Sequence, residues 1–171
     1  SLVIAKGRTV FVADTSVNER PTPTQMADIA TLAATRARQM GHEPRVALLS
    51  YSTFGNSPSG ESERMREAVK VLDSRRVDFE YDGEMAADVA LDPALLKLYP
   101  FCRLSGPANV LIMPGLYSAH IASKLLEKLG GGTIIGPLLT GLSKPVQITQ
   151  MDAAVSDIVN LAVLACHDAL R

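Results

Sequence analysis

A continuous apolar run, Arg45-Val-Ala-Leu-Leu-Ser50, decides the fold class of this chain. Its length and composition are typical of a strand that is buried on both faces, as the strands of parallel sheets are. A loop rich in hydroxyl groups and glycine follows over residues 51–60, and a helix is expected from about Glu61 to Ser74. A strand, a loop and a helix in this order form the first part of a strand–helix–strand unit.

The same alternation continues on both sides of this run. Further strands are expected at residues 9–13, 77–81, 109–114, 133–139 and 146–148, with Asp82-Gly83 turning the chain after the second of these. Further helices are expected at residues 21–40, 94–99, 118–129 and 155–170. This alternation favours an α/β fold, with a mostly parallel sheet flanked by helices on both faces. No repeat or long linker interrupts the chain, so we expect residues 1–171 to form one unit.

Composition narrows the classes of function. Of the 171 residues, 47% are hydrophobic and 20% are charged, which is typical of a packed globular protein. Seventeen basic and eighteen acidic residues give a net charge of −1, which argues against nucleic acid as the main partner. Because the chain shows neither a long apolar run nor a signal peptide, we expect a cytoplasmic protein with no membrane partner.

The two cysteines give no sign of a metal site. Neither Cys102 nor Cys166 has a metal-ligand spacing to another cysteine or to a histidine, so no metal is expected in this segment. Cys166 lies in the apolar run near the end of the chain, where a small core residue is expected.

Candidate binding residues follow the ends of the predicted strands. In open α/β sheets, ligands bind beyond the carboxyl ends of the strands, which here carry residues 14–18, 50–60 and 114–120. Free backbone N–H groups at the start of a helix favour phosphate, and a loop rich in serine precedes one here. Its polar residues are Ser50, Ser52, Thr53, Gly55, Ser57 and Ser59. The alternative is a surface loop of polar turn residues, and neither a Walker A nor a dinucleotide-binding glycine pattern is present.

Five short motifs occur in an order that resembles one enzyme family. They are Ala13-Asp14-Thr15-Ser16-Val17-Asn18, Leu49-Ser50-Tyr51-Ser52-Thr53-Phe54-Gly55, Asp82-Gly83-Glu84, Ile135-Gly136-Pro137, and the closing stretch from Pro145 to Asn160. Together they resemble the phosphate acetyltransferases (phosphotransacetylases), which move an acetyl group between coenzyme A and phosphate. The resemblance implies the second, C-terminal lobe of a phosphotransacetylase-type fold, as a fragment of a longer chain.

The closing stretch departs from the family where the chemistry lies. The family form is Pro-Val-Asn-Asp-Leu-Ser-Arg-Gly-Cys-Ser-Val-x-Asp-Ile-Val-Asn, in which the Ser-Arg pair and the later Asp serve acyl transfer. Asp157 matches this Asp, but the Ser-Arg pair falls on Gln150 and Met151. A methionine cannot stabilise a developing oxyanion as a guanidinium does, so the catalytic residues stay unknown. The resemblance implies that acyl-CoA or phosphate is bound by Asp14, Asn18, Ser50, Ser52, Thr53, Gly55 and Asp157.

Other details resemble the C-terminal domain of hybrid NADP-dependent malic enzymes. These include Val46 to Ser50, Met65 to Val69, Asp82 to Met85 and Lys144 to Ile148. The resemblance implies a regulatory domain that binds acetyl-CoA, forms a homodimer or higher oligomer, and leaves NADP and the divalent metal to the rest of the parent chain. An active phosphate acetyl- or butyryltransferase is an alternative, with Arg64, Arg66 or Lys144 replacing the arginine. A structural oligomerisation lobe is a third.

Overall fold

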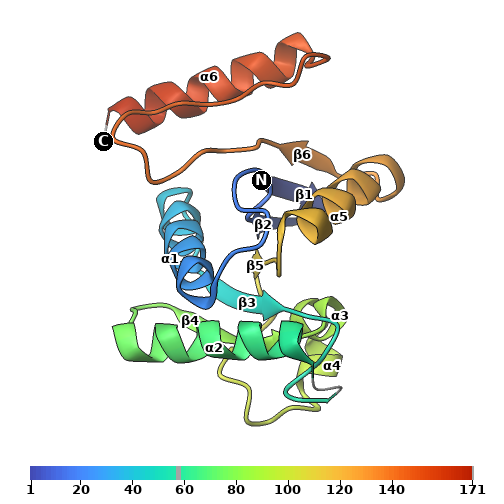
Figure 1. The fold of residues 1–171 in the computed structure, drawn as a ribbon. Helices are drawn as coiled ribbons and strands as arrows, with labels where there is room; N and C mark the ends of the chain where they lie inside the picture. Colours follow the sequence, from blue (N-terminus) through green and yellow to red (C-terminus); the bar gives the residue numbers. More distant parts are fainter. Residues whose placement is uncertain (57–58, 171) are drawn as a thin grey trace.

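The computed structural model describes residues 1–56 and 59–170, which form one six-stranded sheet and its helices (Figure 1). The strands are β1 (Leu2–Ala5), β2 (Arg8–Ala13), β3 (Arg45–Leu49), β4 (Glu80–Met85), β5 (Val110–Ile112) and β6 (Thr133–Ile135). The helices are α1 (Pro23–Gln39), α2 (Gly60–Arg75), α3 (Ala87–Leu91), α4 (Pro93–Leu96), α5 (Leu116–Leu129) and α6 (Val155–Ala169).

The strand order of the sheet is β4-β3-β5-β2-β1-β6. Strands β4, β3, β5 and β2 pair in parallel, whereas β1 pairs antiparallel with both β2 and β6. The predicted α/β class is confirmed, and the sheet is mixed because β1 adds two antiparallel pairings. Sequence reasoning missed β1. This strand is joined to β2 by a two-residue hairpin turn, in which Lys6 and Gly7 have the positive φ angles, 50° and 71°, that such a turn requires.

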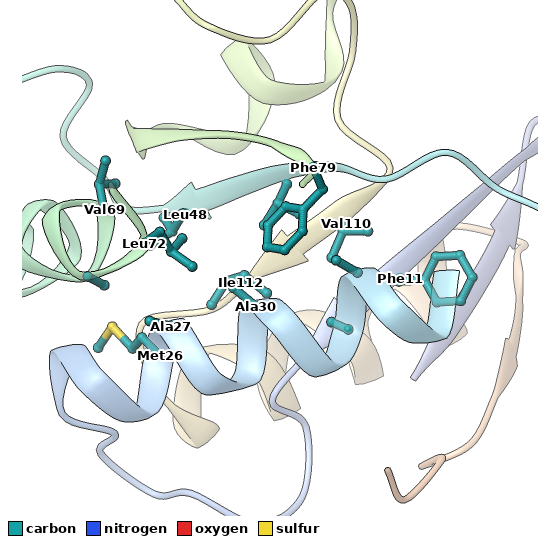
Figure 2. Packing of buried hydrophobic residues seen from close by; sticks show 14 of the residues in the cluster. Phe11, Met26, Ala27, Ala30, Leu48, Val69, Leu72, Phe79, Val110 and Ile112 are labelled. Carbon is teal, nitrogen blue, oxygen red and sulfur yellow. The ribbon is translucent and has the colours of Figure 1, made fainter. Parts of the chain in front are cut away.

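Two hydrophobic clusters lie on opposite faces of this sheet. Along β3, Val46 and Leu48 face the cluster under α1 and α2, while Ala47 and Leu49 face the cluster under α3 and α4. Figure 2 shows the first cluster, in which Leu48 and Leu72 pack near Met26 and Ile112. The alternation explains why the run at residues 46–49 is apolar throughout: helices cover both faces of the strand.

The starts of the two long helices are capped by side chains. The Thr22 hydroxyl accepts a hydrogen bond from the Gln25 backbone N–H, and the Gln25 side chain accepts one from the Thr22 N–H. Ser59 and Ser62 form the same reciprocal arrangement at the start of α2. Such capping satisfies N–H groups that have no partner within the helix, so both starts are fixed locally by sequence.

Several predicted elements differ from the structure. The strand expected at residues 77–81 lies at residues 80–85 as β4, and the strand expected at residues 133–139 ends at Ile135. Asp82 and Gly83 do not turn the chain but lie within β4, where Gly83 has a φ of 154° and a Cβ atom would meet the Leu48 carbonyl oxygen at 2.7 Å. Glycine is therefore needed at this position because β4 approaches β3 closely there. Residues 146–148 form no strand, and Gln147 makes one isolated bridge to Leu138.

The C-terminal part of the chain packs loosely against the rest. After Ile112, the buried hydrophobic residues among those described are Ala119 and Leu161 alone. Figure 1 shows α6 lying across the top of the molecule, beyond β6. The expectation of a core position for Cys166 is wrong, because its side chain is exposed. Within residues 1–56 and 59–170, no helix has the length and apolar character that a membrane span needs.

Candidate functional site

The predicted site residues lie in three separate places, which are spread from β3 to β6 across the sheet. Asp14 and Asn18 line a cavity of 180 Å³ between the end of β2, α1 and residues 137–140. Gln150 and Asp157 line a second cavity, of 260 Å³, beside β6 and the start of α6. The serine-rich loop after β3 lines neither of them. The structure therefore brings Asp14 close to Asn18 and Gln150 close to Asp157, but it does not gather all three groups in one cavity.

Asp14 organises the loop that follows β2. Its carboxylate accepts hydrogen bonds from the backbone N–H groups of Ser16, Val17 and Asn18 at 2.7–3.1 Å, and from the Asn18 side-chain amide at 2.7 Å. Burial alone would raise the pKa of Asp14, but these hydrogen bonds outweigh it and lower the pKa below its usual value. Asp14 is thus an anion at neutral pH, and the N–H groups that a ligand phosphate would use are occupied.

The serine-rich loop is bound to a buried carboxylate of the protein itself. Glu84 Oε1 accepts hydrogen bonds from the Ser52 hydroxyl at 2.7 Å and from the Gly55 N–H at 2.8 Å. The Thr53 hydroxyl accepts a hydrogen bond from Ala86 N–H, and that of Ser50 accepts one from Ser52 N–H. The Ser52 hydroxyl and the Gly55 N–H are therefore already bound to Glu84 of β4. Ser57 lies outside the described residues.

Glu84 is a buried residue of this region that sequence reasoning did not predict as a site residue. Its side chain is fully buried, and it pairs with Arg66 at 3.1 Å. Its second oxygen, Oε2, has no hydrogen-bond partner among the described residues. The match of Asp82-Gly83-Glu84 to a family motif was the available signal, but the partners of Glu84 lie 18 to 32 residues away in the sequence. Glu84 thus links the second and third motifs into one physical unit.

The cavity that holds the closing motif is acidic. Among the described residues, its lining carries the carboxylates of Glu127, Asp152 and Asp157, against a single ammonium group, that of Lys128. Lys128 pairs with Glu127 at 3.0 Å. The Asp157 carboxylate accepts a hydrogen bond from Ala154 N–H at 3.0 Å, so it caps the start of α6.

The two residues that replace the family Ser-Arg pair lie in different surroundings. The Gln150 side chain accepts a hydrogen bond from Lys124 Nζ at 3.3 Å, whereas the Met151 side chain is fully exposed. The cations considered as substitutes for the arginine lie elsewhere. Arg64 donates to the carbonyl oxygens of Pro21 and Pro114, and Arg66 pairs with Glu63 and Glu84. Lys144 lines a third cavity, which Gln150 does not share.

The described residues offer no metal site. No group of three or more His, Cys, Asp or Glu side chains in this part of the chain is placed to hold a metal ion. Burial raises the pKa of the half-buried Cys102 thiol to about 11, which disfavours the reactive thiolate. The geometry is that of an α/β protein with cavities beyond the carboxyl edge of its sheet.

Comparison with known proteins defines the family. The family model described as phosphate acetyl/butaryl transferase matches residues 1–166, and the chain therefore belongs to this family. An NADP-dependent malic enzyme of Rhizobium meliloti is 62% identical over 170 residues, covering 99% of this chain and 22% of the relative. A phosphate acetyltransferase of Treponema pallidum is 42% identical over 158 residues, covering 90% of this chain and 47% of the relative.

A solved structure confirms the predicted fold. The EutD phosphotransacetylase from Staphylococcus aureus superposes with a TM-score of 0.91 at 31% identity, covering 98% of this chain and 52% of that structure. The chain thus spans about half of the phosphotransacetylase and about a fifth of the malic enzyme it matches.

Proposed function

We propose that this chain is a regulatory domain that binds acetyl-CoA and transfers no acetyl group to phosphate. In the parent protein, acetyl-CoA bound here would inhibit the oxidative decarboxylation of malate, which an NADP-dependent malic enzyme carries out elsewhere in the chain. The NADP and the divalent metal would belong to that other part. Similarity to NADP-dependent malic enzymes over 99% of this chain supports the proposal.

The charge of the closing-motif cavity carries the non-catalytic part of the proposal. Phosphate is negatively charged at neutral pH, and the three carboxylates would repel it, because Lys128 and the neighbouring Lys124 are both paired with Glu127 and leave Asp152 and Asp157 without a cation among the described residues that line the cavity. A working transferase needs a cation that holds phosphate or the developing oxyanion. At the position of the family arginine, Met151 points into solvent and supplies no charge.

Restoring the lost pair tests this reasoning. The full-length parent protein is assayed for phosphate-dependent release of coenzyme A from acetyl-CoA, and we expect no turnover above background. The double variant Gln150→Ser, Met151→Arg should show measurable turnover, whereas a matched control, Gln150→Asn with Met151→Leu, should not. Turnover by the unchanged protein would overturn the non-catalytic assignment.

One observation favours an active acetyl- or butyryltransferase as the second candidate. Lys124 lies within hydrogen-bond distance of Gln150, and Lys128 lines the same cavity, so α5 could supply the missing cation. If the full-length protein does turn over acetyl-CoA, Lys124→Met should reduce the rate at least about a hundredfold, the usual cost of removing an oxyanion-stabilising donor. An unchanged rate in Lys124→Met would remove this candidate.

The exposed apolar side chains favour self-association as part of the proposal. α5 exposes Ile121 and Leu125, and α6 exposes Val155, Val159 and Val163. A helix that is apolar around most of its circumference is normally covered. We propose a homodimer or higher oligomer of the parent protein, which sedimentation would show; a monomer at micromolar concentration would contradict this part.

A further inference from the structure

A third cavity, of 230 Å³, lies between α1 and residues 139–145, below the end of α6. Its polar lining includes Thr35, Arg36, Thr140, Ser143, Lys144 and Asp168. Leu32, Leu139 and Leu142 form its apolar part. It adjoins the Asp14 cavity, because Arg36, Leu32, Leu139 and Thr140 line both. We refer to it as the Arg36–Lys144 cavity.

The charge of this cavity is opposite to that of the closing-motif cavity. Arg36 and Lys144 supply two cations, and Asp168 is the single carboxylate among the described residues that line it. Two hydroxyl groups, on Thr140 and Ser143, add donors that can turn toward a bound anion, whereas the Thr35 hydroxyl donates to the Thr31 carbonyl oxygen at 2.9 Å. Of the two cavities, this one offers an excess of positive charge and of hydrogen-bond donors.

Arg36 is paired on one side only. Its side chain is 6% exposed, and its Nη1 atom donates to the Asp168 carboxylate at 2.5 Å and to the Gln39 side chain at 3.5 Å. The other two nitrogen atoms, Nε and Nη2, are buried and have no hydrogen-bond partner among the described residues. Burying a donor without a partner costs about 1–3 kcal/mol, and more for a charged group. The guanidinium therefore has capacity for an anion with several oxygen atoms.

We propose that the Arg36–Lys144 cavity binds a phosphoryl group, which Lys144 and the hydroxyls of Thr140 and Ser143 hold and whose oxygen atoms compete with Asp168 for Arg36. Nε and Nη2 are buried and Nη1 is held by Asp168, so the ligand reaches the guanidinium only when Asp168 moves aside. The phosphoryl group can be free phosphate or a phosphate of coenzyme A. The second source rests on the proposed function.

Competition for Arg36 couples ligand binding to α6. The helix buries one residue, Leu161, and its ion pair with the rest of the protein is Asp168 with Arg36. An anion that displaces Asp168 removes this pair and loosens the end of α6. Binding in the cavity would therefore change the position of α6, and with it any contact that the exposed face of α6 makes in the parent protein.

Two substitutions with opposite expected signs test the proposal. Binding of inorganic phosphate to the full-length parent protein is measured by calorimetry. Lys144→Met should weaken binding at least about tenfold, the usual order for one charge-assisted hydrogen bond. The control Lys97→Met removes an exposed lysine at the end of α4, far along the chain from the cavity, and should leave the dissociation constant unchanged. Asp168→Asn should strengthen binding several-fold, because the competing charge is gone while the side chain keeps its shape.

The sign of the Asp168→Asn effect separates competition from damage to the fold. A misfolded variant binds more weakly, so tighter binding supports the proposal, and weaker or unchanged binding overturns it. An unchanged dissociation constant in Lys144→Met would overturn it as well. Acetyl-CoA and its analogue without the 3′-phosphate form a second arm, which tells free phosphate from a coenzyme A phosphate. If acetyl-CoA binds and Lys144→Met alters neither ligand, the cavity assignment fails while the proposed function stands.

Discussion

The N-terminal two thirds and the C-terminal third of this chain differ in how they use apolar side chains. In residues 1–113, which we call the packed region, strand and helix side chains fill two clusters on the faces of the sheet. In residues 116–170, the open region, helices α5 and α6 are more apolar than α1 and α2 but bury only Ala119 and Leu161. Apolar sequence therefore identifies the helices of both regions, but it does not say which part of the protein covers them. We therefore expect most of the stability of the chain to come from the packed region, and we propose that the exposed apolar side chains of the open region form its interaction surfaces.

The largest expected effect separates the two regions by stability. Leu48→Ala should lower the free energy of unfolding by about 2–5 kcal/mol, because it leaves a cavity in a fully packed cluster. Val163→Ala on α6, whose side chain is 61% exposed, should change it by no more than about 0.5 kcal/mol. Chemical denaturation of this chain measures both. A comparable loss in the two variants would show that the open region is packed after all.

The next effect sharpens the account of the packed region. Glu84→Gln should cost about 2–3 kcal/mol of stability, because Ser52, Gly55 and Arg66 lose a charged acceptor in a buried site. Glu63→Gln is a matched control, since Glu63 pairs with the same Arg66 at the surface, where the loss of an ion pair should cost much less stability. Equal effects would mean that the buried carboxylate does not hold the serine-rich loop.

A smaller effect, with a defined dependence on pH, is expected at Asp14. A carboxyl group whose pKa is lower in the folded state stabilises the fold above its unfolded pKa, and this stabilisation is lost as the pH falls through the lowered folded value. As the pH falls below about 4, the ordinary pKa of an aspartate, the unchanged protein should therefore lose more stability than Asp14→Asn. Denaturation at several pH values checks this, and parallel pH profiles would contradict it.

The smallest perturbation uses the two cysteines, one in each region. Burial raises the pKa of Cys102 to about 11, whereas Cys166 on α6 is exposed. At about pH 7.5, a maleimide should label Cys166 much faster than Cys102 in this chain. Peptide mass spectrometry after timed labelling gives the two rates. Protection of Cys166 in the full-length protein would show that α6 is covered there, and faster labelling of Cys102 would break the comparison.

Much of the packed region follows from the sequence for a simple physical reason. A strand that is covered on both faces must be apolar at every position, so β3 and β5 could be predicted from their own residues. The caps of α1 and α2 are local as well. The pair Asp82-Gly83 was wrongly predicted as a turn because these residue types are typical of turns. The glycine is needed instead because the Leu48 backbone of the neighbouring strand leaves no room for a Cβ atom.

The candidate site was harder to predict than the fold. Motif matching located Asp14, the serine-rich loop and the closing stretch, but it could not show that Glu84 and the Asp14 carboxylate occupy the loops' donors. The pairing of Arg36 with Asp168 joins residues 132 positions apart, for which no local pattern exists. Cys166 was misplaced because an apolar helix predicts burial without naming its cover.

Titration of acetyl-CoA into the full-length parent protein tests the central claim most directly. Binding is followed by calorimetry, and malate-dependent reduction of NADP is followed in the same samples. The account predicts saturable binding together with falling malic activity, and no release of coenzyme A when phosphate is added. Unchanged malic activity under saturating acetyl-CoA, or phosphate-dependent release of coenzyme A, would contradict it.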